Sequence, residues 1–121
     1  GYKSYQSTLR GVAQVTAAAN TRTFQKEITL SAVEAMTLTS LEIINCNPDP
    51  VAVSGTTTVA ISDTPWYGAG TEILCSAAYN LEASASRGTG SISIAAGAKA
   101  YLYITVIGGH SDVEVSFEVE D

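Results

Sequence analysis

The residue types that most often perform catalysis are sparse in this chain. His110 is the only histidine, and it lies in a Gly-Gly-His-Ser turn beside Ser111 and Asp112. A hydrolase triad requires a nucleophile and an orienting carboxylate that both converge on the histidine. Adjacent residues of a strand point to opposite faces, and the chain has no Gly-x-Ser-x-Gly motif. We therefore expect a solvated turn at His110 and no enzymatic activity.

Phosphate and nucleic-acid binding are also disfavoured. The cluster Arg87-Gly88-Thr89-Gly90 is rich in turn residues, but it lacks the helix and the lysine of a phosphate-binding loop. The formal net charge is −6 and the isoelectric point is about 4.5, so little in the chain would neutralise the phosphates of a nucleic acid. The sequence predicts no nucleic-acid partner.

Oxygen-bearing side chains alternate in the turn that contains Asn45, Asn47 and Asp49. The calcium loop of EF-hands begins with a similar spacing, but here Pro48 and Pro50 stand in the turn and no closing glutamate follows. Two interpretations stay open. One is a weak calcium site completed by carboxylates from elsewhere, and the other is the ordinary turn chemistry of Asn and Asp, with no cofactor.

The two cysteines, Cys46 and Cys75, also allow two interpretations. A disulfide would close a loop of about 30 residues and contribute about 3 to 4 kcal/mol by the chain-entropy model. The alternative is two buried thiols that behave as small apolar residues. A zinc site is not expected, because two cysteines and one distant histidine do not make a ligand set.

Four aromatic residues form a candidate ligand platform or interface. Tyr101 and Tyr103 fall on the same outward face of a predicted strand, and Trp66 and Tyr67 lie in a loop flanked by Gly and Pro. Such a platform would stack on the pyranose rings of a glycan. The alternatives are that the tyrosines are ordinary strand residues with Trp66 closing one end of the core, or that the aromatics form a subunit contact.

Alternation with a period of two residues predicts the elements that position these side chains. The clearest case is 112–120, where Val113, Val115, Phe117 and Val119 share one face and acids and Ser116 share the other. Similar alternation is present at 23–30, 36–44, 51–61, 91–95 and 99–106.

Three local details of these strands can be anticipated. Phe24, Ile28 and Leu30 have the same parity, so all three are expected to face inward. The apolar parity of 36–44 switches near Ser40, which indicates a bulge there or burial on both faces. The short connections after residues 95 and 107 predict that the last three strands are antiparallel neighbours, while 76–86 is expected to be a loop followed by a strand.

These features together predict one all-β domain. The chain has 121 residues, of which 45% are apolar, and seven or eight short strands with turns about every 10 residues are typical of a single antiparallel β-sandwich. Immunoglobulin-like and jelly-roll topologies both stay open. No run of 18 apolar residues occurs, so no membrane span is expected.

The N-terminal segment, residues 1–19, is expected to be an extended arm or strand that precedes a sandwich domain at 20–121. Its apolar parity is carried by Tyr5, Leu9, Ala13 and Val15, with Gly11 between them. Four of the six basic residues lie in the first 26 positions, and residues 112–121 hold five acids. Two arrangements follow: the first strand pairs with the last inside one monomer, or the arm adds to the sheet of a neighbouring copy.

The segments TLRGVAQVTAAAN, FQKEITL, SISIAAGAKAYLYITV and DVEVSFEVE resemble secreted β-sandwich subunits of bacterial and archaeal surface filaments. The resemblance implies an N-terminal strand that completes a neighbour's sheet. We therefore expect a non-enzymatic structural subunit, extracellular or on the cell surface, that self-assembles by strand addition through residues 2–17. The alternatives are a capsid decoration or fibre protein of a virion, and a carbohydrate-binding module that uses the surface aromatics.

Overall fold

The computed structural model describes residues 2–9, 22–45, 56–65, 70–78, 85–107 and 113–120, and in these residues every regular element is a β-strand. This confirms the expected all-β class. The eight strands are β1 (Tyr2–Leu9), β2 (Arg22–Thr29), β3 (Met36–Asn45), β4 (Thr56–Ser62), β5 (Glu72–Ala78), β6 (Ala85–Ile94), β7 (Lys99–Ile107) and β8 (Val113–Glu120).

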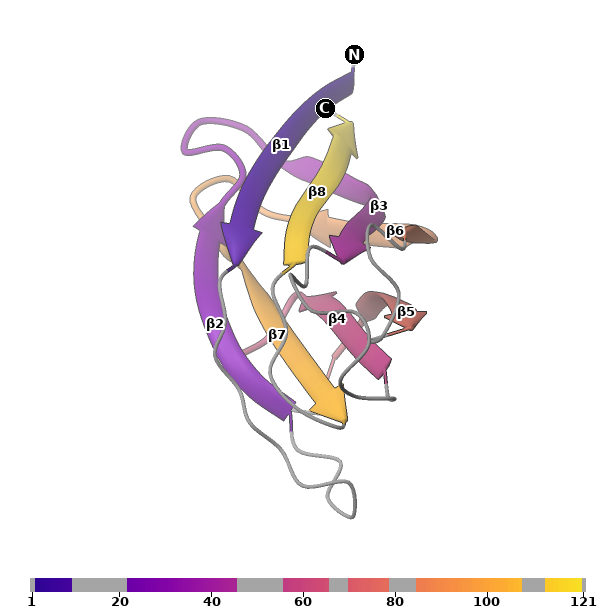
Figure 1. Ribbon diagram of the computed structural model, residues 1–121. Helices are drawn as coiled ribbons and strands as arrows, with labels where there is room; N and C mark the ends of the chain where they lie inside the picture. Colours follow the sequence, from indigo (N-terminus) through magenta and orange to yellow (C-terminus); the bar gives the residue numbers. More distant parts are fainter. Residues whose placement is uncertain are drawn as a thin grey trace.

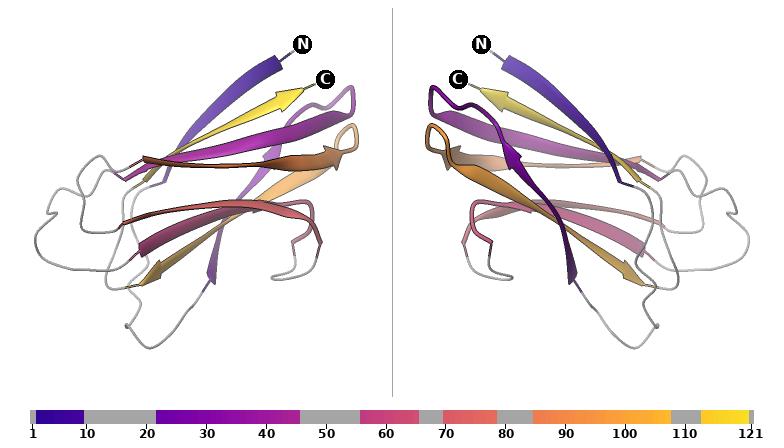
Figure 2. Two further views of the ribbon diagram at one scale, coloured as in Figure 1. Left: turned by 90° about the vertical axis from the view of Figure 1, so that its right-hand side faces the viewer. Right: turned by 90° about the vertical axis from the view of Figure 1, so that its left-hand side faces the viewer.

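The strands form two four-stranded antiparallel sheets that face each other (Figures 1 and 2). One sheet has the order β1-β8-β3-β6 and the other has the order β2-β7-β4-β5. This order is that of an eight-stranded jelly roll, so the structure selects that topology over the immunoglobulin-like one. The prediction that the last three strands are neighbours is wrong, because β7 belongs to the opposite sheet. A short connection that crosses between sheets has the same sequence signals as a hairpin.

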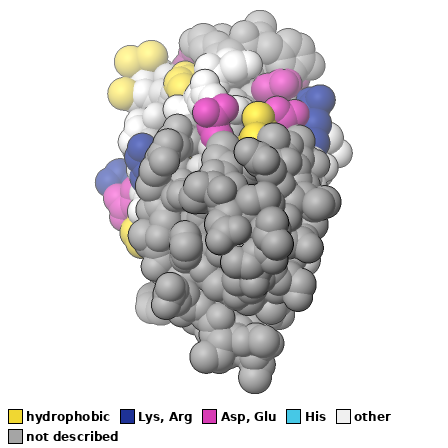
Figure 3. Space-filling view, in the orientation of Figure 1, with side chains coloured by type: hydrophobic (Ala, Val, Ile, Leu, Met, Phe, Trp, Pro, Cys, Tyr) yellow, Lys and Arg dark blue, Asp and Glu magenta, His cyan; other side chains and the backbone are white. Residues whose placement is uncertain are grey.

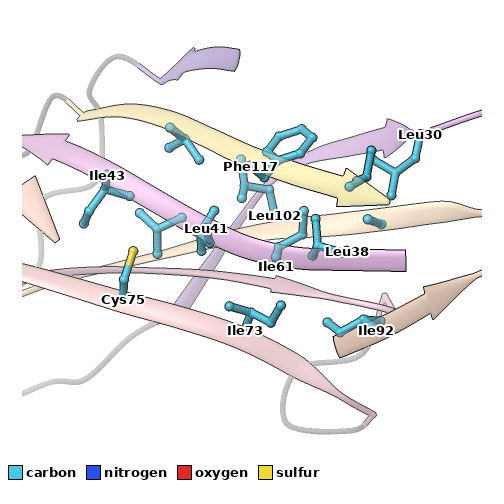
Figure 4. Close-up of a cluster of buried hydrophobic side chains, with 14 of the residues drawn as sticks. Leu30, Leu38, Leu41, Ile43, Ile61, Ile73, Cys75, Ile92, Leu102 and Phe117 are labelled. Atoms are coloured by element: carbon cyan, nitrogen blue, oxygen red, sulfur yellow. The ribbon is translucent and has the colours of Figure 1, made fainter. Parts of the chain in front are cut away.

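The core lies between the two sheets and consists mainly of aliphatic side chains, together with Met36, Cys75 and the ring of Phe117 (Figure 4). β8 alternates as predicted, with Val113, Val115, Phe117 and Val119 buried and the intervening side chains partly exposed. The opposite sheet contributes its own buried set, which includes Val59, Ile61, Ile73, Leu102 and Val106. Both inner faces are therefore apolar, as sandwich packing requires.

A β-bulge at Thr39 explains the parity switch in β3. The register of β3 shifts between Leu38 and Ser40 against both of its neighbours, β6 and β8. Leu38 and Leu41 are consequently both fully buried although their parities differ. The Thr39 hydroxyl donates a hydrogen bond to the carbonyl oxygen of Glu118 at 3.3 Å. The bulge expected near Ser40 is confirmed.

A second bulge, in β2, overturns one prediction. The register against β7 shifts between Phe24 and Lys26. Even-numbered residues therefore face outward before Gln25 and inward after it. Ile28 packs on the core and Leu30 is buried, as expected, but Phe24 is 49% exposed and faces outward. The extra residue is the physical reason that these three side chains do not share a face.

One flank of the sandwich is closed by close packing of β5 against β6 (Figure 1). A Cβ atom at Gly88 would collide with the carbonyl oxygen of Leu74, and one at Gly90 would lie 2.9 Å from the side chain of Ile73. Residues 87–90, expected to form a turn, are therefore part of β6, where glycine lets two backbones approach. The opposite flank ends in β1 and β2, the end strands of their sheets.

Candidate assembly interface

β1 is an end strand that pairs with β8 over its whole length. The register runs without a shift from Tyr2 opposite Glu120 to Leu9 opposite Val113. The chain termini consequently lie side by side (Figure 1). Residues 2–9 therefore form the intramolecular pairing that was one of the two arrangements expected for the arm. The backbone of Leu9 is part of this strand, whereas Gly11, Ala13 and Val15 lie outside the described residues.

Among the described side chains of β1, that of Tyr5 anchors the strand to the rest of the molecule. Its ring stacks on Phe117 of β8, with centroids 5.8 Å apart and an interplanar angle of 18°. Its hydroxyl donates a hydrogen bond of 3.0 Å to the carbonyl oxygen of Leu30, which follows β2 in the opposite sheet. One half-buried residue thus connects β1 to both sheets, as its odd parity in the arm suggested.

Charge pairing between the two ends of the chain differs from the expectation. Glu114, Glu118 and Glu120 of β8 stand opposite Thr8, Ser4 and Tyr2, which are uncharged. Glu118 instead lies 3.7 Å from the guanidinium group of Arg87 in β6, and both side chains are about half exposed. Figure 3 shows acidic and basic side chains next to each other on the described part of this face. Such exposed pairs contribute little to stability.

A small polar hollow of about 70 Å³ borders β1 on the outer face of its sheet. Its lining includes Ser4 of β1, Ser116 of β8, and Glu42 with Arg87 from β3 and β6. The volume is that of a few water molecules at most. The hollow is therefore a feature of the surface beside β1 and too small for a sugar ring or a peptide.

The four edges of the two sheets are not equivalent. β5 and β6 pack against each other, and β2 is interrupted by its bulge at Gln25. The register places Lys26 opposite the buried Leu102, so a charged residue stands on the inward face of that edge. Bulges and inward charges are devices that prevent unwanted strand pairing. β1 has no register shift, and Lys3 is its only charged residue.

The expected aromatic platform is not present as predicted, because Tyr103 is only 4% exposed. Its hydroxyl donates a hydrogen bond to the carbonyl oxygen of Pro65, and its ring meets Phe24 edge-on at 5.8 Å. Burial raises the pKa of the Tyr103 hydroxyl. Tyr101 is partly exposed on the same outer face, and Trp66 and Tyr67 lie outside the described residues. A buried ring cannot stack on a sugar, so the prediction that Tyr103 belongs to an exposed platform is wrong.

An ion pair that the sequence did not suggest helps to cover Tyr103. Arg22 of β2 makes two hydrogen bonds to the carboxylate of Glu72 in β5, at 2.6 and 3.1 Å. The guanidinium carbon lies 5.7 Å from the centre of the Tyr103 ring. β2 and β5 are the two end strands of this sheet, so the pair spans its outer face. No spacing rule connects two residues so far apart in sequence.

Of the two cysteines, the structure describes only Cys75. Cys75 is a free thiol in β5 whose sulfur points into the core (Figure 4). Burial is the largest cause that raises its pKa from 9.0 to about 11. Cys75 therefore fits the interpretation of a buried thiol that behaves as a small apolar residue. Cys46 lies outside the described residues.

The candidate calcium and catalytic residues fall mostly outside the described parts of the chain. Asn45 ends β3, but Asn47 and Asp49 are not described, nor are His110, Ser111 and Asp112. Among the residues that are described, no three His, Cys, Asp or Glu side chains gather as a metal site would require. The same residues contain no helix that is long and apolar enough to cross a membrane.

No protein-family model matches the chain, and no curated protein matches it.

Proposed function

We propose that this protein is a non-enzymatic structural subunit that assembles with copies of itself by β-strand addition of its N-terminal strand, in an extracellular or cell-surface filament. The observation that supports this proposal is the character of β1. It is a regular end strand, it pairs along its whole length with β8, and Tyr5 anchors it in a ready-made position. Main-chain pairing with a side-chain anchor is how strand addition works.

In the donated form, β1 of one copy would occupy the same place beside β8 of the next copy. The stack of Tyr5 on Phe117 and the hydrogen bond to Leu30 would then join two subunits. Residues 10–21 separate β1 from β2, and an extended segment of that length spans on the order of 40 Å. Both forms contain the same contacts, so a high protein concentration favours the assembled form. A contact of this kind that does not close into a ring produces a filament.

The second candidate function is that of a capsid decoration or fibre protein of a virion. The observation that favours it is the strand order, because jelly rolls occur in viral capsid domains. They also occur in lectin domains, so the topology alone does not assign a function. The burial of Tyr103 weighs against the glycan-binding alternative.

Sedimentation velocity of the full chain over a wide concentration range tests the proposal. A synthetic peptide of residues 2–17 serves as a competitor for the place beside β8, and the same peptide with Tyr5→Ala is the matched control. We expect multimers at high concentration that the first peptide dissociates and the control peptide leaves nearly unchanged. A chain that stays monomeric throughout, or multimers that resist the peptide, would contradict the proposal.

A further inference from the structure

We infer that the free edge of β1 is a second contact surface, which pairs antiparallel with β1 of another copy across a two-fold axis. This inference deepens the proposed function and rests on its claim that β1 is an intersubunit strand. Strand donation uses the side of β1 that faces β8. The contact inferred here uses the other side, which ends the sheet in the described part of the molecule.

Among the sheet edges formed by the described strands, that of β1 is the best suited to such pairing. An incoming strand needs a regular row of backbone donors and acceptors. The register of β1 against β8 has no shift, whereas β2 is interrupted at Gln25. β5 and β6 pack closely against each other, with the backbone of Gly88 against the carbonyl of Leu74, so a strand that approaches either edge meets the other strand.

The charge of β1 favours another copy of the chain, in antiparallel orientation, as the occupant of this edge. β1 contains no acidic residue, whereas the protein as a whole has a net charge of −6. Pairing two β1 strands therefore joins the subunits through segments that do not add to their mutual repulsion. Lys3 stands near one end of β1. A parallel pair in register would set Lys3 against Lys3, whereas an antiparallel pair separates the two lysines, so the antiparallel arrangement is favoured.

The geometry of an antiparallel pair of β1 strands is compatible with a two-fold axis. Directly opposed residues of an antiparallel pair lie on the same face, and a two-fold axis places a residue opposite itself. The axis can pass through Tyr5 or through Gln6, so that this residue lies opposite its own copy. In both registers nearly all residues of β1 are paired, and opposed residues lie on the same face of the sheet. The two inner faces then lie on the same side of one continuous sheet. Symmetric closure of this kind yields a dimer, or links two donated chains side by side.

The test uses the full chain with Ser4→Lys and Gln6→Lys together. Both residues are exposed, and Ser4 lies opposite Glu118, so the lysines favour pairing of β1 with β8. In either symmetric register, however, the new lysines of two copies meet across the axis and oppose pairing of β1 with β1. The matched control is Thr89→Lys with Ser91→Lys, which adds the same charge to exposed positions of β6.

The measurement is the dissociation constant of self-association from sedimentation equilibrium, with and without the competitor peptide of residues 2–17. We expect the Ser4→Lys, Gln6→Lys chain to dimerise about tenfold more weakly or worse, while the control associates like the parent. An association weakened by the lysines, with remaining multimers that the peptide still dissociates, would support the inference and the proposed function together. Association unchanged by the lysines would overturn the inference and leave strand donation intact. Dimers that resist the peptide but are lost with the lysines would support the inference and contradict donation.

Discussion

The two flanks of the sandwich differ in how their end strands, β5 with β6 and β1 with β2, are packed (Figure 1). On one flank, β5 and β6 approach so closely that Gly88 leaves no space for a side chain beside Leu74. On the other flank, β1 is held by pairing with β8 and by the contacts of Tyr5. The close packing of β5 on β6 in the closed flank therefore contributes to the stability of the monomer. Under the proposed strand addition, another copy would supply the contacts of β1 on the open flank.

The largest expected effect is on the closed flank. Gly88→Val places a side chain against the Leu74 carbonyl, a backbone atom that cannot move aside without separating β5 from β6. We expect a loss of about 3 kcal/mol in the free energy of unfolding, measured by urea denaturation. Thr89→Val, at an exposed neighbouring position of β6, is the control and is expected to change stability by less than about 0.5 kcal/mol. Equal stabilities would mean that this flank is not closed.

The open flank is expected to be less sensitive. Tyr5→Ala removes the stack on Phe117 and the hydrogen bond to Leu30, and we expect a loss of about 2 kcal/mol. Tyr5→Phe keeps the ring and loses only the hydrogen bond, at about 1 kcal/mol. The same urea experiments measure both. If Tyr5→Ala costs more than Gly88→Val, the ranking of the two flanks is wrong.

Two ion pairs, Arg22 with Glu72 and Arg87 with Glu118, are expected to contribute less to stability than these packing contacts. Arg22 and Glu72 form a two-point contact with side chains that are 16% and 23% exposed, so Arg22→Met is expected to cost about 1 kcal/mol. Arg87→Met removes the looser pair with Glu118 and is expected to cost less than about 0.5 kcal/mol. Thermal denaturation of the two variants side by side measures the difference. An equal loss of stability would show that the geometry of the pairs does not matter.

The last prediction concerns the thiol of Cys75 on the closed flank, and its effect is visible only at alkaline pH. Its pKa is raised by burial from 9.0 to about 11, so the folded protein holds this proton more tightly than the unfolded chain does. The resulting stability is fully present below pH 9 and is lost as the pH rises through 11. We expect the unfolding free energy of the parent to fall more steeply between pH 8.5 and 11 than that of Cys75→Ala, with both values measured at each pH. Parallel pH profiles would contradict the raised pKa.

Much of the fold was predictable because alternation is a local signal. β8 follows its sequence pattern residue by residue, and the parity switch in β3 reveals the bulge at Thr39. The bulge at Gln25 leaves no such trace, because Phe24 and Ile28 keep the same parity and the extra residue is visible only against β7. The assignment of β7 to the opposite sheet was also missed, since a connection of a few residues serves a hairpin and a crossover equally well.

The candidate interface was predictable only in part. The odd parity of Tyr5 marked it as a contact residue of the arm, and the structure adds its two partners, Phe117 and Leu30. The burial of Tyr103 depends on Arg22 and Pro65, which are remote in sequence, so its outward parity was mistaken for exposure. Contacts between distant segments leave no signal in spacing or composition.

The central claim is that β1 pairs with β8 of another copy, and an engineered cross-link tests it most directly. Ser4 and Glu118 stand opposite each other in register, and opposed Cα atoms of an antiparallel pair are about 4.5 to 5.5 Å apart, within reach of a disulfide. The variant carries Ser4→Cys and Glu118→Cys with Cys46→Ser. Its control carries Thr37→Cys and Ser93→Cys, an opposed pair on β3 and β6, with the same Cys46→Ser change.

Both variants are oxidised at high protein concentration and separated on a denaturing, non-reducing gel. We predict a ladder of covalent multimers for the Ser4→Cys, Glu118→Cys chain and a single monomer band for the control, because β3 and β6 are not exchanged between copies. A monomer band for both variants, with the new disulfide formed inside each chain, would contradict the claim.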